Sequence, residues 1–136
     1  EHHKGQISLP GGMCEGNESL CETALRETEE EIGVNRNKVE LLGSLTPFFV
    51  PITGYIIHPY IGWCKEKPLT KIYKGEVDKL FSISINELLD KNIIVTEEWS
   101  IRGYDASVPY YNFGLCKVWG ATAAILSEFK VILEEI

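Results

Sequence analysis

The chain contains no dense run of lysine or arginine, and its formal net charge is −7. A protein that holds nucleic acid by its phosphates normally presents a basic face. We therefore expect no nucleic-acid partner. An acidic chain can still bind a polyphosphate when metal ions neutralise the charge between them.

Long apolar runs and paired cysteines are also missing. No apolar stretch approaches the roughly 18 residues of a membrane-spanning helix, so we expect no membrane partner. The cysteines show neither a CxxC pair nor a cysteine–histidine spacing typical of zinc sites. They are Cys14, Cys21, Cys64 and Cys116. Since no secretion signal is present, we interpret them as free thiols and expect a cytoplasmic protein.

The chain has enough apolar material for a core. Of its 136 residues, 44% are hydrophobic and 10% aromatic, and there are no repeats or low-complexity tracts. This length fits one domain. Because the sequence starts abruptly near a predicted strand, we expect a single domain over residues 1–136 that lacks its first residues.

Local patterns predict alternating strands and helices. Residues 6–9 alternate polar and apolar, which is typical of a short strand. Ser19 and Glu22 have the spacing of a capping box, and Gly33 is a typical helix end, so they delimit a helix. We expect further strands in residues 39–49, 55–64, 80–85, 93–99 and 110–113, a short helix in 86–90 and a last helix in 118–135. This order predicts an α/β fold, a mixed sheet with helices on both sides.

Three carboxylates share one arc of the first predicted helix. Glu27 and Glu31 lie about one turn apart, and Glu30 flanks them. Such like charges repel each other, and they crowd the end of the helix where its dipole disfavours anions. We infer that the cluster holds a cation, and oxygen ligands of this kind suit Mg²⁺ or Mn²⁺.

The alternative is an acidic helix face that only contacts solvent. Three features favour a site instead. Arg26 is within i,i+4 reach of both Glu22 and Glu30, a glycine turn precedes the helix, and Glu18 stands before it at a fixed interval.

Residues 12–34 resemble the Nudix box, whose form is Gly-x5-Glu-x7-Arg-Glu-U-x-Glu-Glu-x-Gly-U with U a bulky aliphatic residue. All the fixed polar and glycine positions match; they are Gly12, Glu18, Arg26, Glu27, Glu30, Glu31 and Gly33. Val34 fits the last U, whereas Thr28 at the first U is a departure. The resemblance implies a hydrolase with a Nudix-type α/β/α sandwich, in which a mixed β-sheet lies between helices.

The resemblance also implies roles for the helix residues. Glu27 and Glu31 would be metal ligands for Mg²⁺ or Mn²⁺, and Glu30 would be a ligand or the base for the attacking water. Arg26 would orient Glu27 by a hydrogen bond. These roles make Glu30, Arg26 and Glu27 the candidate catalytic residues.

Further roles fall on the loop before the helix. Glu18 would support this loop or bind a further metal. The carbonyl of Gly11 or Gly12 would complete the protein ligands, and both glycines would contact the substrate. The metal would lower the pKa of a bound water and neutralise the diphosphate.

The flanking segments resemble the coenzyme A pyrophosphatases of this family. Residues 3–12, which read HKGQISLPGG, fit the subfamily's x-Gly-x-Val-x-Phe-Pro-Gly-Gly stretch, although Glu1 stands in place of its arginine. Residues 108–111 and 118–123 resemble its aromatic strand and the Trp-Gly-x-Thr-Ala helix start. The implied reaction hydrolyses coenzyme A or its derivatives to 3′,5′-ADP and 4′-phosphopantetheine.

Several alternatives remain open at this point. The substrate could be another nucleoside diphosphate derivative such as ADP-ribose, or the chain could be a non-catalytic nucleotide-binding module. Tyr110 and Tyr111 fit the core better than an adenine platform. Glu97 or Glu98 could instead supply the base. Either way, the partner is a small nucleotide-type molecule, and the choice between monomer and homodimer stays open.

Overall fold

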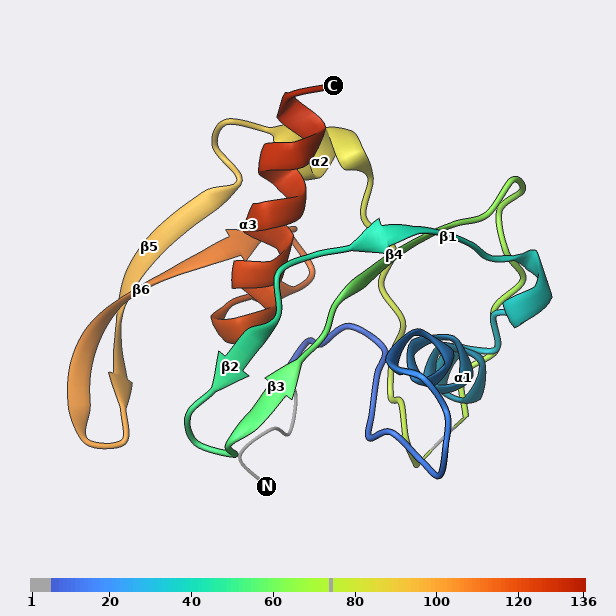
Figure 1. Cartoon of the computed structure of the whole chain (residues 1–136). Helices are drawn as coiled ribbons and strands as arrows, with labels where there is room; N and C mark the ends of the chain where they lie inside the picture. The colour runs from blue at the N-terminus through green and yellow to red at the C-terminus, as the bar shows by residue number, and fades with distance from the viewer. Residues whose placement is uncertain (1–5, 74) are drawn as a thin grey trace. The chain divides into compact units, whose positions relative to one another are not determined.

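The computed structural model describes residues 6–73 and 75–136 (Figure 1). Contacts divide the described chain into two compact units, one of Leu9–Phe81 and one of Ser82–Ile136 together with residues 6–8. Within the described part of the chain, no helix is both long and apolar enough to cross a membrane. Each unit contains one helix that begins with a capping box.

In the unit of residues 9–81, the first helix is α1 (Leu20–Ile32). Ser19 caps it, donating its N–H to Glu22 at 2.8 Å and accepting the Glu22 N–H at 3.2 Å. Gly33 ends it in the left-handed conformation at φ 73°. This confirms the predicted helix and both of its ends. A side chain at Gly33 would also lie 2.8 Å from the backbone nitrogen of Lys71, so this crossing requires glycine.

Two short antiparallel pairs complete this unit. After the 3₁₀ turn η1 (Arg36–Lys38), β1 (Glu40–Ser44) pairs with β4 (Tyr60–Trp63). Between them, β2 (Phe48–Val50) and β3 (Tyr55–Ile57) form a hairpin, visible in Figure 1. The predicted strand regions 39–49 and 55–64 are therefore confirmed, each divided into two strands.

The other unit contains a longer hairpin and two helices. After α2 (Ile85–Leu89), β5 (Ile94–Ile101) pairs with β6 (Tyr104–Asn112), and β6 pairs with β7 (Lys117–Val118). The last helix is α3 (Gly120–Glu134). The Tyr111 hydroxyl of β6 lies 2.7 Å from the Ser127 hydroxyl of α3, which ties the helix to the sheet.

Some sequence expectations were wrong. The described residues 6–9 are not part of a strand. The strand expected in 80–85 is absent because Ser84 caps α2 and Ile85 is already helical. The expected α/β fold is confirmed, and its described strands pair antiparallel in three small sheets. The sequence features at residues 1–5 lie outside the described residues.

Candidate metal and catalytic site

Arg26 ties the loop before α1 to the helix. Its guanidinium donates to both carboxylate oxygens of Glu18, at 2.8–3.2 Å, and to the carbonyl of Met13 at 2.9 Å. It also donates to Glu30 at 3.1 Å. The arginine side chain is only 12% exposed, so these charge-assisted bonds are shielded from solvent. They fix the loop of residues 13–18 against the helix.

The expected hydrogen bond from Arg26 to Glu27 is not formed in the structure. The nearest guanidinium nitrogen lies 3.8 Å from Glu27 Oε1, an ion-pair distance rather than a hydrogen bond. Geometry explains the difference, because adjacent residues of a helix do not face each other, whereas Glu30 stands at i,i+4. Arg26 therefore orients Glu18 and Glu30 and acts on Glu27 only through its charge.

Glu18 supports the loop, one of the two roles expected for it. Its carboxylate accepts the N–H of Glu15 at 2.9 Å and the hydroxyl of Thr23 at 2.8 Å, besides the bonds from Arg26. Arg26, the Glu15 N–H and Thr23 together lower the pKa of Glu18 from its ordinary 4.5 to about 2. Glu18 is thus held as a carboxylate at any physiological pH.

Glu27 lies against the glycine turn. Its carboxylate packs so closely on the backbone of Gly12 that a side chain at this position would overlap it. The Glu27 side chain is 18% exposed. Burial raises the pKa of Glu27; the Arg26 charge lowers it, and the charges of Glu31 and Glu30 raise it further. A partly buried carboxylate beside two others is stabilised by a bound cation.

Glu31 faces the same turn, since its Oε1 accepts the N–H of Gly11 at 2.7 Å. The structure therefore brings Glu27 and Glu31 to the Gly11–Gly12 backbone, with Glu30 on the flank and 52% exposed. The sequence could predict that the carboxylates share one arc of α1. It could not show that the glycine turn folds back onto that arc.

The residues present fit a hard divalent cation in their chemistry. Carboxylate and backbone carbonyl oxygens are the donors that Mg²⁺ and Mn²⁺ take, and the remaining positions go to water and phosphate. Among the described residues, no three histidine, cysteine, aspartate or glutamate side chains alone form a group that could hold a metal ion. Backbone and substrate oxygens are thus needed to complete the coordination.

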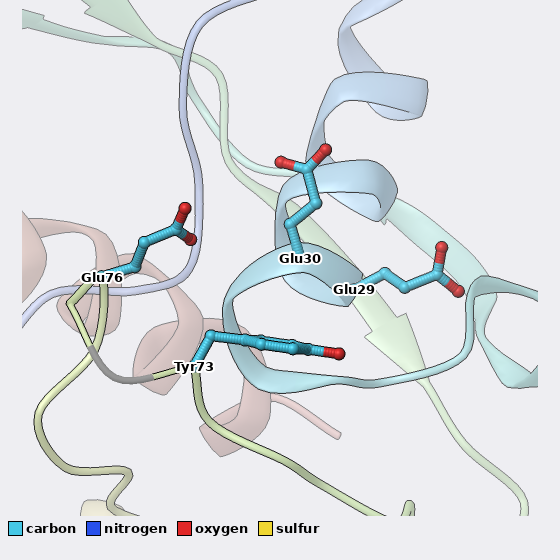
Figure 2. A pocket seen from close by; sticks show the side chains of 4 residues that line it. All are labelled: Glu29, Glu30, Tyr73 and Glu76. Carbon is cyan, nitrogen blue, oxygen red and sulfur yellow. The ribbon is translucent and has the colours of Figure 1, made fainter.

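An open pocket of about 420 Å³ adjoins the end of α1. It is lined by Glu29, Glu30, Tyr73 and Glu76, and Figure 2 shows these side chains. The segment around Tyr73 reaches the helix because the Lys71 N–H donates to the Ile32 carbonyl at 2.8 Å. Neither Tyr73 nor Glu76 is in the motif, and no spacing in the sequence pointed to them.

Glu29 is bound by Arg36. It accepts from the Arg36 side chain at 2.9 and 3.0 Å and from the Arg36 N–H at 3.2 Å. These bonds lower the pKa of Glu29. Glu29 therefore fixes η1 to the helix, which agrees with its place at a variable position of the motif.

Glu97, the alternative base, is committed within the sheet of β5, β6 and β7. It accepts from the Trp99 indole at 3.0 Å and the Tyr110 hydroxyl at 2.9 Å. Hydrogen bonds from Trp99 and then Tyr110 lower the pKa of Glu97. Glu98 accepts a hydrogen bond from Ser107. Tyr110 is 3% exposed, which confirms it as a core residue.

Comparison with known proteins agrees with this geometry. Residues 1–101 match the NUDIX domain family. The chain is 32% identical over 127 residues to the uncharacterized Nudix hydrolase NudL of Photorhabdus laumondii, covering 93% of this chain and 67% of that protein.

Two similar proteins are named for a substrate. The chain is 31% identical over 134 residues to the mitochondrial coenzyme A diphosphatase NUDT8 of Homo sapiens, covering 96% of this chain and 56% of that protein. It is 34% identical over 90 residues to the peroxisomal coenzyme A diphosphatase ndx-8 of Caenorhabditis elegans, covering 65% and 38%. This chain thus spans between about a third and two thirds of these relatives. A Nudix box with all of its fixed polar and glycine positions on a capped helix, its carboxylates on a glycine turn and the match over residues 1–101 make the chain a member of the Nudix hydrolase family, with an α/β Nudix fold.

Proposed function

We propose that this chain hydrolyses the diphosphate bond of coenzyme A or its derivatives, giving 3′,5′-ADP and 4′-phosphopantetheine. The observation that carries the chemistry is the approach of Glu27 and Glu31 to the Gly11–Gly12 backbone. The choice of substrate is supported by similarity to two coenzyme A diphosphatases, one along 96% of the chain.

In this proposal, the chain's own residues divide the work. Glu27, Glu31 and the Gly12 carbonyl hold Mg²⁺ or Mn²⁺, which supplies charge neutralisation and an acidified water when bound. Because Gly12 carries no side chain, the Glu27 carboxylate can pack on its backbone, and the open space beside Gly11 leaves room for the diphosphate. Glu18 and Arg26 keep the loop in place.

Glu30 is the residue we propose for accepting the proton of the attacking water, with Glu27 as the other candidate. Glu30 is more exposed than Glu27 and accepts a hydrogen bond from Arg26 at 3.1 Å. That hydrogen bond orients its carboxylate, whose two oxygens offer further lone pairs for a water. Attack of this water on phosphorus then breaks one bond between phosphorus and the bridging oxygen of the diphosphate.

We also propose that residues 1–136 form one Nudix domain. The family match runs from residue 1 to 101 and so crosses the division between the two compact units near residue 81. A functional unit would then need residues of both.

The testing experiment is a Mg²⁺- or Mn²⁺-dependent assay with coenzyme A, in which both products are identified by mass spectrometry. The proposal expects 3′,5′-ADP and 4′-phosphopantetheine in equal amounts, and neither product when the metal is chelated. Hydrolysis of ADP-ribose without hydrolysis of coenzyme A would refute the substrate and retain the chemistry. Turnover that is indifferent to chelation would refute the metal site.

A further inference from the structure

Thr23 is a polar residue that is buried on α1. It lies in the variable segment of the Nudix box, the seven residues between Glu18 and Arg26. Its exposure is 5%, and it is the only buried residue of α1. A buried hydroxyl costs free energy unless its hydrogen bond is made, so its partner matters.

The partner is the carboxylate that Arg26 clamps. Thr23 Oγ1 donates to Glu18 Oε1 at 2.8 Å and lies 3.1 Å from the Ser19 carbonyl oxygen. The same Glu18 oxygen accepts from Arg26 at 2.8 Å and from the Glu15 N–H at 2.9 Å. The hydroxyl thus completes a largely buried set of donors around one oxygen atom.

From this oxygen, a short chain of contacts leads to the proposed metal site. Arg26 holds Glu18 with one part of its guanidinium and reaches Glu30 at 3.1 Å and the Met13 carbonyl at 2.9 Å with the rest. Met13 follows Gly12, on whose backbone the Glu27 carboxylate packs. A shift of Glu18 would therefore move both the arginine that orients Glu30 and the loop that carries Gly12.

We propose that the Thr23 hydroxyl is a positioning group for the metal site, acting through Glu18 and Arg26. This inference rests on the proposed metal-dependent function and names for it a residue at a variable position of the motif. Removing a group that hydrogen-bonds to a metal ligand typically changes the metal affinity by about 10- to 100-fold. Thr23 is farther from the proposed ligands, since Glu18 and Arg26 lie between them. Because Glu18 keeps its other donors, we expect the lower end of that range.

The test compares Thr23→Val, which removes the hydroxyl at nearly constant volume, with Thr23→Ser, which keeps it. Thr28→Val is the matched control, since the Thr28 hydroxyl donates to the Ala24 carbonyl at 2.7 Å within the same helix. Mn²⁺ binding is measured by electron paramagnetic resonance without substrate. Hydrolysis of coenzyme A then gives kcat and KM at saturating Mn²⁺ and at limiting Mn²⁺.

We expect Thr23→Val to bind Mn²⁺ about 10-fold more weakly and to lose kcat at limiting metal, with KM for coenzyme A unchanged. Thr23→Ser and Thr28→Val should both remain within about twofold of the unaltered chain. If valine prevents folding, Thr23→Ala provides the same comparison, since it lacks the hydroxyl and is smaller.

Two results would overturn the inference. One is unchanged Mn²⁺ affinity in the folded variant that lacks the hydroxyl. The other is an equal loss in Thr28→Val, because that would assign the effect to the helix in general. Failure of the proposed substrate gives a different result: the unaltered chain then binds Mn²⁺ but does not hydrolyse coenzyme A, and the binding comparison still decides the role of Thr23.

Discussion

Replacing Glu31 with glutamine should abolish turnover and leave the fold intact. Glutamine keeps the oxygen that accepts the Gly11 N–H, now 2.7 Å from Glu31 Oε1, so the turn stays attached to α1. The change also removes the repulsion between Glu31 and Glu27 at i,i+4, which is about 0.2–0.5 kcal/mol for such pairs. Partial loss of the charge-assisted bond to Gly11 offsets that gain.

The expected change in the free energy of unfolding is therefore below about 0.5 kcal/mol, or about 2 °C in Tm for a chain of this size. The metal response should change far more. At a Mg²⁺ concentration of about 100 times Kd, binding adds about 2.7 kcal/mol to the stability of the unaltered chain. We expect this gain, of roughly 8 °C, to be lost in Glu31→Gln.

Thermal unfolding with and without Mg²⁺, followed by the coenzyme A assay, measures both effects. Glu22→Gln is the matched control, because Glu22 is on the same helix and serves only in the capping box, where glutamine also functions. It should retain both activity and the Mg²⁺ response. A Glu31→Gln variant that is folded, active and still stabilised by Mg²⁺ would refute the assignment of this carboxylate to a metal.

Three further predictions follow from the same contacts. Gly12→Ala should abolish the Mg²⁺ response in a folded protein, because its methyl group would displace the Glu27 carboxylate; Mn²⁺ titration measures this. Gly33→Ala should lower the free energy of unfolding by more than about 1 kcal/mol, measured by urea denaturation, since φ is 73° and the backbone of Lys71 lies 2.8 Å from the added atom. The pKa of Glu18 is lowered from 4.5 to about 2, so its contribution to stability is present above pH 4.5 and lost as the pH falls toward 2. Glu18→Gln should therefore make Tm less dependent on pH in this window than it is in the unaltered chain.

The first helix was predictable because its determinants are local. A capping box needs two residues and a glycine end needs one, so Ser19, Glu22 and Gly33 were sufficient to place the helix. The strands were located by their β-branched and aromatic residues, whereas their pairing was not. Which strand pairs with which depends on contacts between distant residues. The alternation of polar and apolar residues at positions 6–9 was therefore not sufficient to predict a strand.

The site was predictable in part for the same reason. Helical spacing placed Glu27, Glu30 and Glu31 on one arc. The pairing of Arg26 with Glu18 rather than Glu27 depends on the path of the loop before α1, which brings Glu18 to a residue eight positions later in the sequence. Tyr73 and Glu76 come to the end of α1 only because a backbone bond joins Lys71 to Ile32. No periodicity encodes such a crossing.

The hydrogen bonds also narrow the choice of general base. A carboxylate can take a proton from water only if it has a free lone pair and its hydrogen-bond donors do not strongly lower its pKa. Glu18 and Glu29 are each bound by an arginine that lowers their pKa, and Glu97 is bound by Trp99 and Tyr110 with the same effect. Burial, together with the charges of Glu31 and Glu30, raises the pKa of Glu27, as expected for a carboxylate whose charge a bound cation would stabilise. Arg26 binds Glu30 as well, but the Glu30 side chain is 52% exposed whereas that of Glu18 is 17% exposed, so we propose Glu30 as the carboxylate that meets a water. Arg26→Lys, which keeps the charge but not the forked set of donors, should accordingly lower kcat more than it weakens Mn²⁺ binding. A variant in which both fall equally would assign the arginine to the metal loop alone.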